Sequence, residues 1–124
     1  QQLGLVPSSR IHLLPPVGYL DMLALLQASR ALCTDSGGLQ EEAYALGTPV
    51  LVLRNETEWS YLVDAGCAAL CGNTAHDIPS RALPLLTAPE NARMRAAAKT
   101  LTTQLADGGA AARILAAIKR RFLP

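Results

Sequence analysis

One stretch decides the fold of this chain: Thr34-Asp35-Ser36-Gly37-Gly38-Leu39-Gln40-Glu41-Glu42. Before it, the apolar residues 31–33 suit a short inner strand. After it, good helix formers from 39 to 46 predict a helix that ends at Gly47. Ser36 is a natural N-cap for this helix, and glutamates at its start suit the positive end of the helix dipole. The pattern predicts a strand, a glycine turn and a helix in direct succession.

The glycine pair predicts an anion site. Gly37 and Gly38 have no side chains, so the backbone is accessible at the N-terminal end, or mouth, of the predicted helix. N–H groups and the helix dipole favour a phosphate there. Glu42 follows Gly38 by four residues, so both lie on one helix face. A carboxylate at that distance can accept hydrogen bonds from both hydroxyls of a ribose. We therefore expect a nucleoside diphosphate, with Ser36, Gly37 and Gly38 at the phosphate and Glu42 at the ribose. The alternatives are a tight connection and a solvated helix acid.

Composition and charge exclude several classes of function. The 124 residues fit one compact domain with a mostly aliphatic core, because half of them are hydrophobic and few are aromatic. The net charge of +1 and the lack of a basic stripe make nucleic acid an unexpected partner. No apolar run approaches the ~20 residues of a membrane span, so we expect no membrane partner. The chain starts at Gln1 without a signal peptide, as expected for a fragment, a processed chain or a single domain.

The cysteines and histidines predict no metal site. Cys33, Cys67 and Cys71 each lie in an apolar run, and we expect reduced core residues of a cytoplasmic protein. Cys67 and Cys71 would share one face of a strand about 13 Å apart, which is too far for a disulfide or a shared metal. His12 and His76 have no acidic or thiol partner at ligand spacing. We expect His12 to be structural, and we expect neither a metal nor another cofactor.

Short strands and helices alternate along the sequence. We expect strands at 11–14, 31–34, 48–53 and 67–70, and helices at 18–29, 39–46, 90–105 and 110–122, with the segment after 73 divided into short pieces by Pro79, Pro84 and Pro89. This alternation predicts an α/β fold with an open, doubly wound parallel sheet. Ligands bind such sheets beyond the carboxyl ends of the strands. The loops at 15–22, 35–42 and 54–59 should therefore converge on one site.

Two later motifs extend the first stretch: Leu46-Gly47-Thr48-Pro49-Val50-Leu51-Val52-Leu53-Arg54 and Thr57-Glu58. With them, the sequence from about Ile11 to Ile114 resembles the non-hydrolysing UDP-N-acetylglucosamine 2-epimerase family. The resemblance covers only the later part of that enzyme. It implies a Rossmann-like domain, the C-terminal half of a GT-B type fold. Residues 1–124 would then be a partial C-terminal nucleotide-sugar-binding domain without the N-terminal catalytic domain.

The resemblance also implies an activity. The family interconverts UDP-GlcNAc and UDP-ManNAc by elimination and re-addition of UDP, an isomerase reaction that we associate with cell envelope polysaccharide biosynthesis in the cytoplasm. The family's proton-transfer residues lie in regions that are missing here, and neither His12 nor His76 aligns with its histidine. We therefore name no catalytic residue and expect this chain alone to be catalytically incomplete. Its expected partners are UDP or a UDP-sugar and the missing N-terminal domain, in the same or a separate chain, and a homodimer is possible.

The loop after the first predicted strand resembles the family's nucleobase pocket, with Tyr19 and Met22 as its large side chains. The family commonly has an aromatic residue in place of Met22. A methionine can cover a base but stacks on it less well. The alternative for both residues is a place in the core.

The segment after the strand at 48–53 resembles the sugar and diphosphate side of the family's site. Arg54 could reach a diphosphate or pair with Glu42, Glu58 could take sugar hydroxyls, and Thr57 could fix the turn. The family often has Arg-Pro where Trp59-Ser60 stands here, which affects the sugar contacts most. The alternative for Arg54 is a surface ion pair.

Other functions remain open on the sequence alone. A GT-B glycosyltransferase also binds its nucleotide sugar with a glycine turn and a ribose-binding glutamate. A non-catalytic binding subunit would complete an active site only with a separate chain. A truncated domain with an exposed apolar sheet edge would bind nothing and would self-associate.

Overall fold

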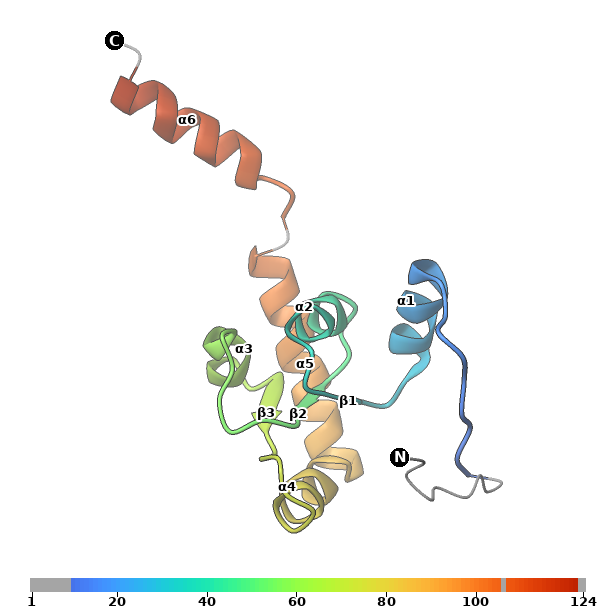
Figure 1. Cartoon of the computed structure of the whole chain (residues 1–124). Coiled ribbons are helices and arrows are strands. Elements are labelled where there is room, and N and C mark those ends of the chain that lie inside the picture. Colours follow the sequence, from blue (N-terminus) through green and yellow to red (C-terminus); the bar gives the residue numbers. More distant parts are fainter. Residues whose placement is uncertain (1–9, 106, 123–124) are drawn as a thin grey trace.

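The fold is built on a small parallel sheet, and the computed structural model describes residues 10–105 and 107–122. Strands β1 (Leu32–Thr34), β2 (Val50–Val52) and β3 (Ala68–Leu70) form a sheet of three in the order β1-β2-β3 (Figure 1). Leu32 pairs with Val50 and Val50 with Ala68, so the strands run in step and their carboxyl ends meet at one edge. The predicted open parallel sheet is confirmed, and the strands predicted at 31–34, 48–53 and 67–70 are present.

Helices cover both faces of the sheet. They are α1 (Tyr19–Ala28), α2 (Gly37–Ala45), α3 (Ser60–Asp64), α4 (Asp77–Leu85), α5 (Ala88–Leu105) and α6 (Ala110–Phe122). One core cluster gathers side chains from α1, α2, α3 and α5 against Val50 and Val52 of β2. A second cluster gathers Leu51 of β2 with side chains from α4 and α5. All three β2 residues are fully buried, as predicted for an inner strand of a doubly wound sheet.

The strand predicted at 11–14 is wrong. Only Ile11 forms an isolated bridge, and Leu13 and Leu14 are 61% and 62% exposed. A strand is stable only where a neighbour satisfies its backbone, and within the described residues the sheet ends at β1. His12 is exposed on this irregular segment rather than placed on a strand.

The helical C-terminal part follows the prediction except at its three prolines, of which Pro89 is the second residue of α5. Helices α5 and α6 lie where helices were expected. Pro79 and Pro84, however, lie inside α4 instead of separating short pieces. Pro79 is in the first turn, where a missing N–H removes no helical hydrogen bond. Pro84 is the last but one residue of α4, so almost no helix follows it.

The cysteines depart from the prediction in two ways. Cys33 is exposed rather than in the core, because it lies on β1 at the edge of the sheet. Cys67 and Cys71 are buried but pack in the first and second core cluster respectively, so they do not share a face. Burial raises the pKa of the Cys67 and Cys71 thiols, which favours their protonated form.

Two further observations concern classes of function. Among the described residues, no helix combines the length and apolar character that crossing a membrane demands. In the same part of the chain, no three His, Cys, Asp or Glu side chains come together in a way that could hold a metal ion.

Candidate functional site

The candidate site is built around the N-terminal end of α2. This helix begins at Gly37, directly beyond the carboxyl end of β1, with Ser36 in the N-cap position. The first N–H groups of a helix have no partner inside it, so they are available to a ligand. The N-cap position of Ser36 is as predicted, but its side chain makes no capping hydrogen bond. Its backbone N–H instead donates to Thr34 Oγ1 at 3.0 Å.

The helix begins at Gly37, where the predicted N-cap at Ser36 places its start. Its first turn therefore carries no acidic residue, and Glu41 and Glu42 lie in the second turn. Their carboxylates gain less from the helix dipole than we expected, because the dipole acts mainly within the first turn. Gly38 and Glu42 still lie one turn apart on the same face of α2.

The two glycines have different surroundings. A Cβ atom at Gly38 would meet nothing within 4 Å, so this side of the helix mouth is open. A Cβ atom at Gly37 would collide with Glu58 Oε1 and lie 3.2 Å from Trp59 Nε1. The space beside Gly37 is thus taken by the far end of the Glu58 side chain, whereas the space beside Gly38 is open to a ligand.

The segments at 35–42 and 54–59 converge, as predicted. Arg54 Nη1 donates to Glu58 Oε2 at 3.0 Å, and the two side chains are 37% and 50% exposed. Arg54 thus forms the surface ion pair that was the alternative reading, with Glu58 and not with Glu42 as its partner. Such an exposed pair contributes about 0–1 kcal/mol to stability.

A residue that the sequence did not single out joins the two segments. Gln40 is fully buried in α2, and its Oε1 accepts a hydrogen bond of 2.7 Å from Thr57 Oγ1. Thr57 Oγ1 in turn accepts the backbone N–H of Trp59 at 3.2 Å. Gln40 Nε2 and Trp59 Nε1 are buried without a partner among the described residues. No local pattern marks Gln40, because a glutamine beside two glutamates looks like part of a solvated helix face.

The two glutamates of α2 are in different situations. Tyr61 donates its hydroxyl to Glu41 Oε1 at 2.7 Å and makes edge-to-face contacts with Tyr44 and Trp59. Desolvation and then this hydrogen bond raise the pKa of Tyr61 well above its usual range. Glu42 is half-buried, and its side chain makes no hydrogen bond to the described residues. Glu41 therefore fastens α2 to α3, and Glu42 is available for a ligand.

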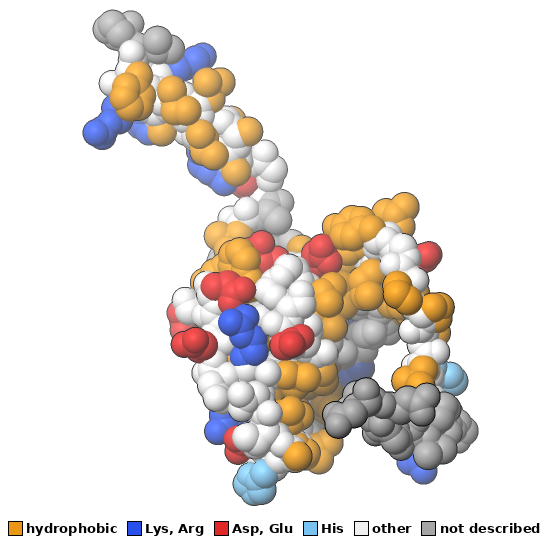
Figure 2. All heavy atoms as spheres, in the orientation of Figure 1, with side chains coloured by type: hydrophobic (Ala, Val, Ile, Leu, Met, Phe, Trp, Pro, Cys, Tyr) orange, Lys and Arg blue, Asp and Glu red, His pale blue; other side chains and the backbone are white. Residues whose placement is uncertain are grey.

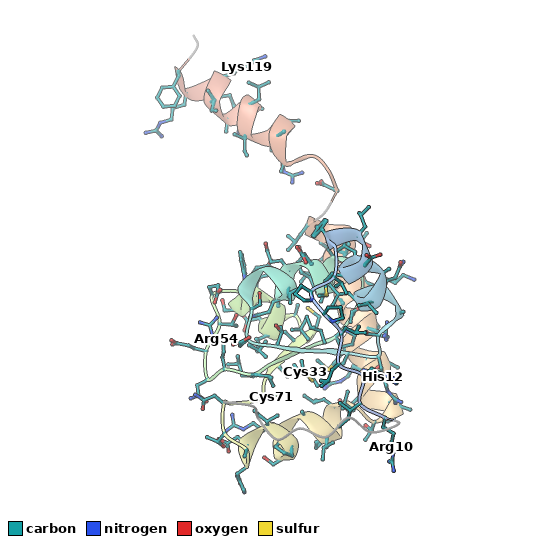
Figure 3. The ribbon with its side chains drawn as sticks, turned by 45° about the vertical axis from the view of Figure 1, so that its right-hand side comes forward. Arg10, His12, Cys33, Arg54, Cys71 and Lys119 are labelled. Carbon is teal, nitrogen blue, oxygen red and sulfur yellow. The ribbon has the colours of Figure 1, made fainter. Side chains whose placement is uncertain are left out.

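An open hollow of about 610 Å³ lies at the same edge of the sheet. Its lining comes from the ends of all three strands: Asp35, Leu53, Arg54, Asn55, Glu56 and Asn73. Arg54 is the cation in this lining. In Figure 3 Arg54 lies at the side of the sheet opposite His12.

The two residues expected at the nucleobase lie on α1. Tyr19 is its first residue and is 63% exposed, so it is not a core residue. Met22 is partly buried and packs on the first core cluster, which fits the alternative reading. Neither makes a side-chain hydrogen bond or ring contact within the described residues. Their role at a base remains a prediction.

Comparison with known proteins gives a consistent picture. The family described as UDP-N-acetylglucosamine 2-epimerase matches residues 2–119. The UDP-N-acetylglucosamine 2-epimerase of Bacillus subtilis is 40% identical over 108 residues, which cover 87% of this chain and 28% of that protein. A Listeria monocytogenes crystal structure assigned to the same epimerases has a TM-score of 0.75 at 42% identity and covers 94% of this chain and 30% of that one.

A third similar protein carries a ligand. The structure of UDP-GlcNAc 2-epimerase from Neisseria meningitidis bound to UDP-GlcNAc has a TM-score of 0.62 at 36% identity. The match covers 76% of this chain and 28% of that one. The chain therefore spans about 30% of the length of the relatives it matches.

Proposed function

We propose that this chain, which belongs to the UDP-N-acetylglucosamine 2-epimerase family, holds the UDP part of a nucleotide sugar at the N-terminal end of α2. The observation that carries the proposal is the open side of Gly38, where a Cβ atom would meet nothing within 4 Å. Glu42 lies one turn further along the same helix face, and its carboxylate has no partner among the described residues. A phosphate at the helix mouth and a ribose at Glu42 fit this spacing.

Different residues of the site would contact different parts of the ligand. The first N–H groups of α2, at residues 37–39, would donate to phosphate oxygens, and Gly38 would let the backbone approach closely. Arg54 borders the neighbouring hollow, where its guanidinium could reach the diphosphate. Thr57 and Glu58 would lie on the sugar side, and Tyr19 and Met22 on the base side. A relative with UDP-GlcNAc bound supports this ligand class.

Tight binding of UDP would contribute to the reaction itself. In the proposed reaction UDP and the C2 proton leave the sugar by anti elimination, a glycal forms, and UDP then adds back at C1 while a proton adds to the opposite face of C2, which gives the C2 epimer. When the C–O bond breaks, negative charge develops on the departing phosphate. N–H groups and a helix dipole aimed at that phosphate stabilise the charge and keep UDP in place for its return.

The remainder of the reaction belongs to the larger protein in this proposal. We infer that residues 1–124 form a partial C-terminal nucleotide-sugar-binding domain, and that the proton-transfer groups come from an N-terminal domain in the same or a separate chain. The whole protein would be a cytoplasmic isomerase in cell envelope polysaccharide biosynthesis.

Calorimetric titration with UDP tests the proposal, with GDP and inorganic phosphate as comparison ligands. Gly38→Ala should keep the fold, because space is open there, and should weaken UDP binding by about tenfold or more, since the methyl group lies where the phosphate would approach. Glu42→Gln should weaken UDP but not phosphate. Asp64→Asn on α3 is the matched control and should bind like the unaltered chain. If both site variants bind UDP as well as the control does, the proposal is wrong.

A further inference from the structure

Gln40 is buried more completely than a polar residue of a surface helix normally is. Its exposed fraction is 0%, although it lies in the first half of α2 between the open Gly38 and the half-buried Glu42. Glutamine is mostly exposed in folded proteins. Its amide Nε2 has no partner in the described structure, and an unpaired buried donor destabilises a fold. An apolar side chain of the same size would avoid the cost of an unpaired Nε2. We therefore look for the role of Gln40 in the hydrogen bond that its Oε1 accepts.

That bond sets the position of the segment after β2. Gln40 Oε1 accepts from Thr57 Oγ1 at 2.7 Å, and the same oxygen of Thr57 accepts the N–H of Trp59 at 3.2 Å. Glu58, the residue between Thr57 and Trp59, lies against Gly37 and forms an ion pair with Arg54. One threonine hydroxyl therefore joins the inside of α2 to the residues that border its mouth.

The exposed ion pair cannot fix this segment by itself. Arg54 and Glu58 are both exposed by more than a third, so water screens their attraction. The Gln40–Thr57 bond is better shielded, and a shielded hydrogen bond is electrostatically stronger than one in water. The backbone of Arg54 is held at the sheet, where the N–H of Gly72 donates to its carbonyl oxygen at 3.2 Å, so the Gln40–Thr57 bond acts on the loop between Arg54 and Trp59.

We propose that Gln40 is a positioning residue for the nucleotide site, acting through Thr57 to hold the loop that carries Arg54 at the N-terminal end of α2. The proposal rests on the proposed function, because it takes the diphosphate to lie at that end. When the bond is lost, Arg54 loses its fixed place beside the phosphates, and UDP binds more weakly to a chain that is still folded.

The chain offers a matched control. The Tyr61 hydroxyl donates to Glu41 Oε1 at 2.7 Å, the same length as the Thr57–Gln40 bond. Both bonds join a polar side chain of α2 to the chain that follows β2. The Thr57–Gln40 bond acts on the loop at the N-terminal end of α2, whereas the Tyr61–Glu41 bond joins α2 to α3, and Tyr61→Phe removes that bond while keeping the ring contact with Trp59.

The test is a double-mutant cycle of Gln40→Met and Thr57→Val, with Thr57→Ser as the conservative variant and Tyr61→Phe as the control. UDP affinity is measured by calorimetry, folding by thermal melting, and the state of the segment by the fluorescence of Trp59, the one tryptophan of the chain. We expect each single variant to lose about tenfold in UDP affinity or more, since one charge-assisted contact is lost. The double variant should lose no more than either single variant.

The other readouts separate positioning from stability alone. Trp59 emission should shift in Thr57→Val, Thr57→Ser should restore both affinity and emission, and Tyr61→Phe should lower the melting temperature without changing UDP affinity by more than about twofold. A folded Thr57→Val chain that binds UDP like the unaltered chain overturns the role of Gln40 alone. An unaltered chain that does not bind UDP overturns the proposed function and, with it, this inference.

Discussion

The carboxylate of Glu58 lies against Gly37, at the mouth that a diphosphate is proposed to enter. Its second oxygen is held by Arg54. A negative charge at this place would repel a phosphate and would occupy the cation that could bind it. Glu58 therefore opposes UDP binding in this structure, although it could accept sugar hydroxyls once the ligand has displaced it.

Replacing Glu58 should separate these two effects. Repulsion between charges near a protein surface is worth on the order of 1 kcal/mol, so Glu58→Gln should bind UDP roughly fivefold more tightly. The gain should shrink at high salt, which screens exposed charges. Calorimetry at low and high ionic strength measures both. Weaker or unchanged UDP binding in Glu58→Gln would contradict this account.

The two glycines should respond differently to the same substitution. Gly37→Ala places a methyl group against the far end of the exposed Glu58 side chain, which can rotate away, and should cost at most about 1 kcal/mol of stability. Gly38→Ala meets open space inside a helix and should stabilise by up to about 1 kcal/mol. Thermal melts of the two variants make the comparison. Equal melting temperatures would show that the segment at 54–59 does not press on Gly37.

The sequence could predict the roles of single residues only where local spacing defines them. The glycine pair and Glu42 were identified because local spacing defines a helix mouth and a helix face. Gln40 was missed because its burial depends on Thr57, 17 residues later in the chain, and no local pattern contains that contact. Ser36 is the N-cap residue, as predicted, but its side chain makes no capping hydrogen bond, and its backbone N–H donates to the side chain of Thr34.

At the level of elements, Arg95 of α5 donates hydrogen bonds to backbone carbonyl groups that follow the C-terminal ends of α1 and α2. The Arg95 guanidinium donates to the carbonyl oxygens of Ser29 and Arg30 after α1, and to that of Gly47 after α2 at 3.4 Å. Asn91 of the same helix donates to the Arg30 carbonyl at 3.0 Å. Carbonyl groups at helix ends have no partner inside the helix, so these contacts satisfy groups that would otherwise need water.

Removing this contact should destabilise the domain. We expect Arg95→Met to lower the free energy of unfolding by about 1–3 kcal/mol, because several carbonyl groups lose a charged donor at once. Arg93→Met is the matched control. Among the described residues Arg93 pairs only with Glu90, at the surface, so its loss should stay within about 0.5 kcal/mol. Urea denaturation measures both, and equal losses would contradict the role given to Arg95.

The elements that were predicted correctly are those with a complete local signal. The apolar run at 48–53 and the long helices have the composition and length of their class. The segment at 11–14 has the composition of a strand, but a strand also needs a paired neighbour, which a sequence pattern cannot supply. The prolines of α4 have a signal typical of helix breaks but do not break the helix. Their effect depends on where they lie within the helix, which the local sequence did not define.

On the scale of the whole molecule, α6 stands apart from the rest. Figure 1 shows it projecting from the domain, and none of its residues is buried. Its exposed apolar side chains, visible along the helix in Figure 2, are Ile114, Leu115, Ile118 and Phe122. The sheet and its two core clusters are complete without α6.

Shortening the chain tests this arrangement. A chain ended at Leu105 should have a melting temperature within about 2 °C of the longer one, because no buried contact is lost. It should also self-associate less at high concentration, since an exposed apolar stripe is removed. Calorimetric melting and sedimentation measure the two properties. A large drop in melting temperature would show that α6 contributes to the core.

The whole molecule is also expected to lack turnover by itself. His12 lies at the opposite side of the sheet from Arg54 in Figure 3, and His76 is exposed beside Asp77. Neither imidazole is placed to transfer a proton at the mouth of α2. An assay for interconversion of UDP-GlcNAc and UDP-ManNAc should therefore show no activity for this chain. Clear turnover without an added domain would disprove its catalytic incompleteness.

The most direct measurement of the central claim is an NMR titration of the chain with UDP, following the backbone amides. The account predicts saturable shifts that are largest at Gly37, Gly38 and Leu39, with smaller shifts at Glu42. A second hollow, at the other end of α2, is lined by Gly47, Arg95 and Lys99 among others. Saturable shifts centred on that hollow, with the amides of residues 37–39 unchanged, would contradict the account.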